Sequence, residues 1–233
     1  RGFAESPRPH GDGFALDGRE SLTYLDGEAA PVCWSEPAAF RVGEILRSLH
    51  DASDSFLTTD PQWMPWWGRT LPTADPVVGH CDAAPWNFLA ADGLPIALLD
   101  WDTAGPVGRE WDFAQTAWLN SQLHDDDVAE RIGLPAPEVR AHLLGAICDG
   151  YGLDAKGRSG LVASMIEVAT RTSAQEAIDA GVGPDGTSPE AMGLLGGGAP
   201  TSGHDLLWAA SWRVRSARWM LQHRAMLESA ADV

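Results

Sequence analysis

Lysine is nearly absent from this sequence of 233 residues, since Lys156 is the only one. Only 16 basic residues oppose 33 acidic ones, and the formal net charge at pH 7 is −17. A surface of this sign repels phosphate backbones and anionic lipid headgroups, so neither nucleic acid nor a membrane is an expected partner. The charge favours a small cationic molecule instead.

Cysteines and long apolar runs are also scarce. Cys33, Cys81 and Cys148 are far apart and odd in number, which argues against a disulfide framework and a zinc ribbon. No run approaches the roughly 20 apolar residues of a bilayer span, and residues 1–19 lack the apolar core of a signal peptide. We therefore expect a soluble, cytoplasmic protein with enough apolar residues for one large domain or two lobes around a cleft.

Helical periodicity dominates the sequence after its first thirty residues. Behind Ser35, a helix-capping residue, apolar side chains recur at i, i+3, i+4 and i+7, which predicts a helix ending near His50. Similar patterns predict helices over residues 111–123, 137–151, 160–180 and 204–229. Residues 20–25 lie between two Asp-Gly turns and predict a strand, and the glycine-rich residues 181–203 predict a loop.

A polar motif stands out at residues 79–87. It contains His80 and Asp82, and Asn87 follows five positions after the aspartate. This is the spacing of a kinase catalytic loop, in which the aspartate accepts or orients the proton of the attacking hydroxyl and the asparagine supplies an oxygen to Mg²⁺. A magnesium ion that bridges nucleotide phosphates also needs a carboxylate, and Asp100 fits that role.

The turn residues Asp92-Gly93 predict a β-hairpin that brings Asn87 and Asp100 together. A turn here pairs positions whose numbers sum to about 185–187. Since 87 plus 100 is 187, the two side chains are either opposite, about 5 Å apart, or diagonal neighbours at about 7–8 Å. Asp112 opens the next predicted helix, where a carboxylate caps backbone N–H groups or braces the catalytic loop.

On these motifs the chain resembles the aminoglycoside phosphotransferase family, with its choline-kinase-like and homoserine-kinase-like relatives of the protein-kinase-like fold. The resemblance runs from about residue 2 to the C-terminus and is most specific at residues 79–87 and 99–114. It implies an α+β fold with an incomplete small lobe. Residues 1–31 would form the remnant of that lobe with its hinge strand, and residues 32–233 the large helical lobe.

The resemblance also implies a reaction, ATP-dependent transfer of the γ-phosphoryl group to a hydroxyl of a small cationic molecule of aminoglycoside or amino-alcohol type. The roles it implies are Asp82 as catalytic base, His80 as a brace of its loop, Asn87 and Asp100 as Mg²⁺ ligands, and Asp112 as the anchor beneath the loop. The expected hinge, which hydrogen-bonds adenine through its backbone, is Thr23, Tyr24 and Leu25. Asp125 and Asp126 are weaker candidates for contact with the cationic substrate.

One part of the kinase pattern is missing. A kinase covers the phosphates with a glycine-rich loop and carries a basic residue on a following strand, yet only about twenty residues precede the expected hinge and none is lysine. We therefore expect this chain alone to lack the roof of the nucleotide site and to show negligible transfer. Two alternatives stay open: a non-catalytic pseudokinase or nucleotide-binding scaffold, and a metal-dependent phosphoesterase with His80 and Asp82 as ligands.

Overall fold

The computed structural model describes residues 3–53, 63–179, 181–183, 186–187 and 203–232. Its helices are α1 (Glu36–Ser53), α2 (Arg109–Asn120), α3 (Asp126–Ile132), α4 (Pro137–Tyr151), α5 (Ala155–Arg158), α6 (Leu161–Asp179), α7 (Gly203–Gln222) and α8 (Arg224–Ala231), with short 3₁₀ helices η1 (Trp67–Thr70) and η2 (Pro85–Asn87). Its strands are β1 (Pro9–Phe14), β2 (Glu20–Leu22), β3 (Glu28–Ala29), β4 (Pro76–Gly79), β5 (Phe88–Ala91), β6 (Leu94–Leu98), β7 (Gly105–Gly108), β8 (Val182–Gly183) and β9 (Gly186–Thr187). The predicted α+β class is confirmed.

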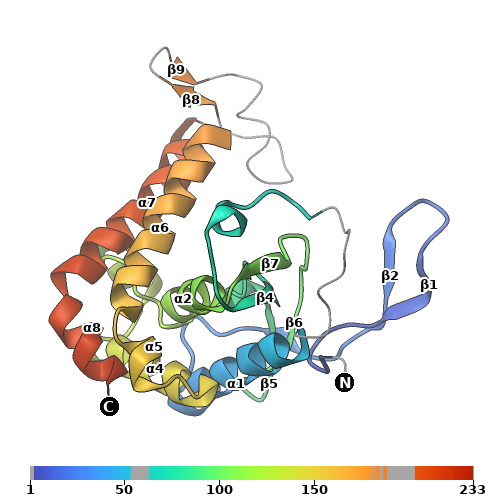
Figure 1. Ribbon diagram of the computed structural model, residues 1–233, viewed down its shortest axis with the longest axis horizontal. Helices are drawn as coiled ribbons and strands as arrows, with labels where there is room; N and C mark the ends of the chain where they lie inside the picture. The colour runs from blue at the N-terminus through green and yellow to red at the C-terminus, as the bar shows by residue number, and fades with distance from the viewer. Residues whose placement is uncertain (1–2, 54–62, 180, 184–185, 188–202, 233) are drawn as a thin grey trace.

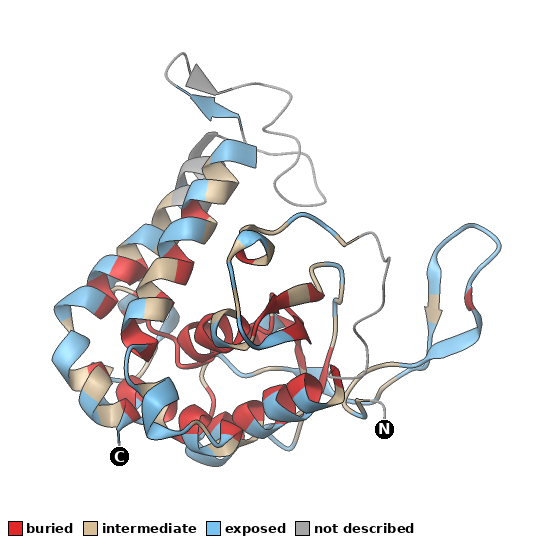
Figure 2. Ribbon diagram, viewed as in Figure 1, coloured by how far each residue is buried: buried red, intermediate tan, exposed pale blue. Residues whose placement is uncertain are grey.

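Helix α2 lies at the centre of the helical body. Every residue from Asp112 to Asn120 is buried, and Figure 2 shows the helix enclosed by the rest of the chain. α6 packs against both α2 and α7, while α1 packs against α4 (Figure 1). Each large apolar side chain buried in this core stabilises the fold by roughly 1.5–3 kcal/mol. The central helix is therefore a rigid platform for whatever its first turn holds.

Two glycines allow α1 and α4 to approach closely. A Cβ atom at Gly43 of α1 would overlap the carbonyl oxygen of Ile147, and one at Gly150 of α4 would overlap that of Phe40. Backbone atoms cannot move away as a flexible side chain can. The position of α1, which carries His50 near its end, thus depends on these two glycines.

The sheets are small and antiparallel. β3, β5 and β6 form one sheet in that order, β4 pairs with β7, and β1 pairs with β2. The Ser53 hydroxyl at the end of α1 accepts a hydrogen bond from the Val78 N–H of β4 at 3.1 Å. This bond joins the end of the first helix to the strand that leads into the polar motif.

The hairpin of β1 and β2 extends away from the helical body, as Figure 1 shows. Four apolar side chains on or beside it, Phe14, Leu16, Leu22 and Tyr24, are exposed. The predicted strand over residues 20–25 is shorter than expected, because β2 ends at Leu22.

Most predicted helices are confirmed, with one correction. The expected single helix over residues 204–229 is wrong, since α7 ends at Gln222 and α8 begins at Arg224. His223 interrupts it, with its ring stacked on Trp219 and Nδ1 3.0 Å from the Trp219 carbonyl oxygen. The glycine-rich residues 181–203 include β8 and β9, and the rest of that predicted loop lies outside the described residues. Within the described ranges, no helix is both long and apolar enough to cross a membrane.

Candidate active site

The polar motif forms a loop held from beneath by Asp112. Strand β4 ends at Gly79, and the loop that follows turns at Cys81, whose φ of 61° is unusual for a residue other than glycine. The Asp112 carboxylate accepts hydrogen bonds from the backbone N–H groups of His80 at 3.1 Å and Cys81 at 2.7 Å. This is the place that the sequence predicted for an anchor. A buried carboxylate thus fixes the loop two residues before Asp82.

Asp82 and Asn87 contact each other directly. The Asn87 side-chain amide donates to the Asp82 carbonyl oxygen at 2.8 Å and to Asp82 Oδ2 at 2.9 Å. The indole N–H of Trp86, a side chain 59% exposed, reaches the same Oδ2 at 3.4 Å. The Asp82 carboxylate is therefore oriented through one oxygen, and no described residue donates a hydrogen bond to Oδ1.

Asn87 and Asp100 lie at the same end of the predicted hairpin. Phe88 pairs with Leu98, and the Leu99 N–H donates to the Asn87 carbonyl oxygen at 2.8 Å. Leu99 is therefore the cross-strand partner of Asn87, and Asp100 directly follows that partner. From the sequence we expected Asp100 opposite Asn87 or diagonal to it, and the observed register places it one residue past the opposite position. Asp100 is exposed and has a left-handed φ of 58°. Such strained backbone conformations are concentrated at functional sites.

The donor set at this end of the hairpin suits magnesium. Since the side-chain N–H₂ of Asn87 donates to Asp82, the side-chain oxygen Oδ1 is turned away from that residue, and no described residue donates a hydrogen bond to it. Mg²⁺ takes oxygen ligands and is commonly held by one or two protein groups together with substrate phosphates. One amide oxygen and one exposed carboxylate match that pattern.

His80 supports the loop from inside the fold. Its side chain is fully buried, its ring lies against Trp101, and Nε2 is 2.9 Å from the Leu99 carbonyl oxygen. Burial lowers the pKa of His80, so the ring is neutral and donates through Nε2 to that carbonyl. No group of three or more His, Cys, Asp or Glu side chains suited to a metal occurs in the described residues. The phosphoesterase alternative, with His80 as a metal ligand, therefore finds no support.

Burial raises the pKa of the Asp82 carboxyl to about 6, although Trp86, Asn87 and the positive charge of Arg213 oppose the shift. Arg213 of α7 donates to Glu176 of α6 at 2.5 Å, and both side chains are mostly buried. The last turn of α6 and the middle of α7 thus bring a paired anion and cation into the electrostatic surroundings of Asp82.

The remaining predicted residues lie elsewhere. The Thr23 N–H donates to the Arg8 carbonyl oxygen at 2.7 Å, while Tyr24 is 86% exposed. Asp125 caps α3 through the Val128 N–H and pairs with Arg215, and the Asp126 carboxylate accepts the Trp219 indole N–H at 2.9 Å. The Asp125 and Asp126 carboxylates are thus already bonded to other parts of the chain, and contact with a cationic substrate stays a prediction for them. The hinge role of residues 23–25 also stays a prediction.

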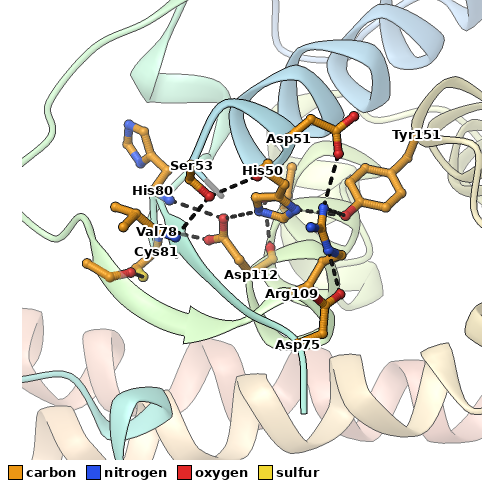
Figure 3. A network of polar contacts seen from close by, with 12 residues as sticks. His50, Asp51, Ser53, Asp75, Val78, His80, Cys81, Arg109, Asp112 and Tyr151 are labelled. Carbon is orange, nitrogen blue, oxygen red and sulfur yellow. Dashed lines mark hydrogen bonds and ion pairs between the residues drawn. The ribbon is translucent and has the colours of Figure 1, made fainter. Parts of the chain in front are cut away.

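Sequence reasoning assigned no role to several residues that hold the loop. Asn120 of α2 donates to the Ala83 carbonyl oxygen at 2.7 Å and accepts the Trp34 indole N–H at 2.8 Å. His50 of α1 bonds to Asp112, as Figure 3 shows. His50 directly follows Leu49 of the apolar stripe and is itself fully buried. A polar histidine next to an apolar stripe was the signal in the sequence that could have pointed to a buried hydrogen-bonding residue.

A pocket of 450 Å³ lies near α2, α4 and α5. Its walls include Arg109, Tyr151 and Lys156 but none of Asp82, Asn87 and Asp100. A pocket without these oxygen ligands does not suit phosphoryl transfer, so we do not place the chemistry there.

Comparison with known proteins supplies independent information. The phosphotransferase enzyme family matches residues 13–156. The trifolitoxin immunity protein of Rhizobium leguminosarum bv. trifolii is 44% identical over 231 residues, which cover 98% of this chain and 83% of that protein.

Two solved structures share the fold. A choline/ethanolamine kinase family protein from Mesorhizobium loti has a TM-score of 0.56 at 14% identity, over 98% of this chain and 78% of that one. The ethanolamine kinase of Plasmodium vivax has a TM-score of 0.53 at 13% identity, over 92% and 68% respectively. These two structures confirm the predicted kinase-like fold.

Proposed function

Because the chain belongs to the phosphotransferase enzyme family, we propose that it transfers the γ-phosphoryl group of ATP to a hydroxyl group of a small molecule. The observation that carries the proposal is the arrangement around Asp82. Its carboxylate is oriented through Oδ2 by Asn87, and Asp100 directly follows Leu99, the cross-strand partner of Asn87. A base and two oxygen ligands on one rigid loop and hairpin are the parts that phosphoryl transfer needs.

Asp82 acts on the acceptor. The acceptor oxygen forms a bond to the γ-phosphorus, the bond from that phosphorus to the bridging oxygen of ADP breaks, and the hydroxyl proton passes to Asp82. The pKa of about 6 leaves this carboxylate ionised at neutral pH yet basic enough to accept a proton. Asn87 and Asp100 would hold Mg²⁺, which offsets negative charge on the phosphates. Most of the acceleration would come from positioning and charge neutralisation.

We further propose that the acceptor carries an amine. The support is the charge of the chain, −17 at pH 7, which concentrates cations near the surface. The Asp82 and Asp100 carboxylates add to that field at the candidate site itself. A hydroxylated amine is thus the acceptor class to test first. Thr23, Tyr24 and Leu25 remain the backbone positions proposed for the adenine contact, with the Thr23 N–H already bonded to the Arg8 carbonyl oxygen.

The test compares Asp82→Asn with a matched control, Asp92→Asn, which changes an exposed carboxylate in the hairpin turn. ADP release is measured with Mg²⁺, ATP and a panel of hydroxylated amines, using this chain together with any in-frame sequence that its gene encodes upstream. We expect Asp82→Asn to lower kcat about 10²–10⁴-fold with ATP affinity nearly unchanged, and Asp92→Asn to match the parent. Parental turnover in Asp82→Asn would overturn the assignment of the base.

Asp100→Asn tests the metal ligand separately. We expect it to abolish the Mg²⁺ dependence of ATP binding, because neutral oxygens alone hold the ion poorly. If a magnesium titration gives the same ATP affinity in the variant and the parent, Asp100 is not the ligand. Wild-type ATP binding with no turnover on any acceptor would instead favour the pseudokinase alternative.

A second proposal concerns the biological role and rests on the relative that is 44% identical and is named a toxin immunity protein. We propose that this chain also protects a cell from a toxin, through phosphorylation of the toxin or of its target. The test is survival of a toxin-sensitive strain that expresses the parent, Asp82→Asn or Asp92→Asn. Protection by the parent and Asp92→Asn alone supports a catalytic role, and equal protection by all three would contradict it.

A further inference from the structure

A chain of hydrogen bonds between buried groups leads away from the underside of the catalytic loop, as Figure 3 shows. His50 Nε2 lies 2.9 Å from Asp112 Oδ2, and His50 Nδ1 lies 2.7 Å from the Tyr151 hydroxyl. Arg109 Nη1 then donates to the same hydroxyl at 3.4 Å. Helices α1, α2 and α4 each contribute to this chain. It therefore joins three separate elements to one loop.

The direction of each hydrogen bond follows from the Asp112 carboxylate. Burial alone would raise the pKa of this carboxyl, but the hydrogen bond from His50 and the N–H groups of the loop outweigh burial and hold the pKa below its ordinary value. An ionised carboxylate only accepts, so His50 Nε2 carries the hydrogen. In a neutral imidazole the other nitrogen, Nδ1, is then an acceptor that needs a donor.

Tyr151 supplies that donor. Its hydroxyl donates to Nδ1 and in turn accepts from Arg109, so each group in the chain is paired. His50 and Asp112 are completely buried and Tyr151 is 3% exposed, so the imidazole is bonded to protein groups and has no contact with bulk solvent. Burial raises the pKa of Tyr151 to about 12, so the phenol keeps its hydrogen at neutral pH.

Asp112 selects the tautomer with hydrogen on Nε2, and without the Tyr151 hydroxyl Nδ1 of this tautomer is a buried acceptor that has lost its donor. The opposite tautomer, with hydrogen on Nδ1, would place the Nε2 lone pair against the Asp112 oxygen, and the two would repel each other. The carboxylate would shift, and with it the N–H groups of His80 and Cys81 that it holds. The effect would reach Asp82, which directly follows Cys81.

We infer that the Tyr151 hydroxyl is a positioning group for the catalytic loop, acting through His50 and Asp112. The outer end of the chain is fixed as well, because Arg109 pairs with Asp75 at 2.7 Å and with Asp51 at 3.5 Å. The inference rests on the proposed function only in calling the loop catalytic. The sequence of hydrogen bonds from Arg109 through Tyr151 and His50 to Asp112 does not depend on any substrate.

The first test is Tyr151→Phe, which removes one oxygen and keeps the ring contacts with His50 and Phe113. The matched control is Ser216→Ala, which removes another buried hydroxyl near a histidine, since Ser216 Oγ lies 3.4 Å from His124 Nδ1. Amide hydrogen exchange is measured on the ligand-free chain. We expect the N–H groups of His80 and Cys81 to exchange at least about tenfold faster in Tyr151→Phe, beyond any change in the slowest core amides, and not in the control.

If the exchange rates of the His80 and Cys81 amides rise no more than those of the core amides, the variant has only lost overall stability. That result would overturn the inference. A second variant keeps the test sharp: in a His50→Gln background, adding Tyr151→Phe should change loop exchange by less than about twofold, because the hydroxyl acts through His50. An additional tenfold effect there would refute the proposed order of action.

Kinetics separate this inference from the proposed function. With an active acceptor, Tyr151→Phe should lower kcat while KM for ATP stays within about twofold, since the hydroxyl is bonded to His50 and Arg109 and is not one of the groups proposed to hold ATP. If Asp82→Asn keeps parental turnover, the proposed function fails while the exchange result still decides the role of Tyr151. If exchange and kcat are both unchanged in Tyr151→Phe, the positioning role fails while the proposed function stands.

Discussion

Replacing the candidate base should make the protein more stable at neutral pH. Asp82 is held with a pKa of about 6 instead of the ordinary 3.8, because burial disfavours its charged form. The folded state therefore binds a proton more tightly than the unfolded state does. The penalty of ionising Asp82 is absent below about pH 4, grows as the pH rises and is complete above about pH 6–7.

The magnitude follows from the shift. A difference of about two pKa units corresponds to about 3 kcal/mol. Since the side chain is only partly buried, solvent screening reduces this to on the order of 1–2 kcal/mol. Asp82→Asn removes the ionisation, and its amide oxygen still accepts from Asn87 and Trp86. At about pH 7.5 the variant should unfold at a urea midpoint about 0.5 M higher than the parent.

Urea unfolding is followed by tryptophan fluorescence at several values between about pH 4.5 and pH 7.5, with Asp92→Asn as the control. The stability advantage of Asp82→Asn should shrink as the pH falls, and Asp92→Asn should match the parent throughout. An advantage that does not change with pH, or a variant less stable than the parent at neutral pH, would refute the reasoning.

Three further predictions concern other parts of the molecule. Asp112→Ala leaves two backbone N–H groups and the His50 N–H without their acceptor, so chemical denaturation should show a loss of about 3–5 kcal/mol. Gly43→Ala forces a methyl group onto the Ile147 carbonyl oxygen, and thermal unfolding should show a loss of at least about 2 kcal/mol. The comparison variant is Gly93→Ala in the hairpin turn, where the added methyl group meets no atom and the cost comes from the positive φ of the backbone alone. Binding of an amine acceptor should weaken as salt is raised towards about 0.5 M, measured by calorimetry, because exposed charges are screened within about 8–10 Å at physiological salt. Tight, salt-insensitive binding of a neutral or anionic acceptor would remove the amine proposal.

The parts of the site that come from residues close together in the sequence could be predicted. Asn87 and Asp100 are related by a short hairpin whose turn residues fix the pairing, so counting from Asp92-Gly93 placed them as neighbours. Because Phe88 pairs with Leu98, Asp100 lies one residue beyond the position opposite Asn87, which is neither of the two arrangements expected. A register shift between Leu89 and Ala90 accompanies this pairing. A two-residue turn leaves few registers to choose from.

The groups that orient the loop were less accessible to sequence reasoning. The contact of His50 with Asp112 joins residues 62 positions apart, and that of His50 with Tyr151 joins residues 101 positions apart. Such contacts depend on how α1 crosses α2 and α4, which in turn depends on close approach at Gly43 and Gly150. Helical periodicity identifies a buried face but not its partner. The pattern therefore placed the end of a helix near His50 without showing that its side chain is buried or what it bonds to.

Asp82 in the loop and Asp112 beneath it illustrate how the fold assigns opposite properties to the same type of side chain. Asp112 is fully buried but accepts three N–H groups between 2.7 and 3.1 Å, so its pKa falls and it stays a fixed anion. Asp82 is less buried, and among the described residues its side-chain donors are Asn87 and a distant Trp86, so desolvation prevails and its pKa rises. A carboxylate saturated with donors is a poor proton acceptor, whereas one with a free oxygen and a raised pKa is a good one. The two roles therefore depend more on the number of hydrogen-bond donors around each carboxylate than on its depth of burial. Asp112 holds the loop, and Asp82 is suited to accept the proton of the acceptor hydroxyl.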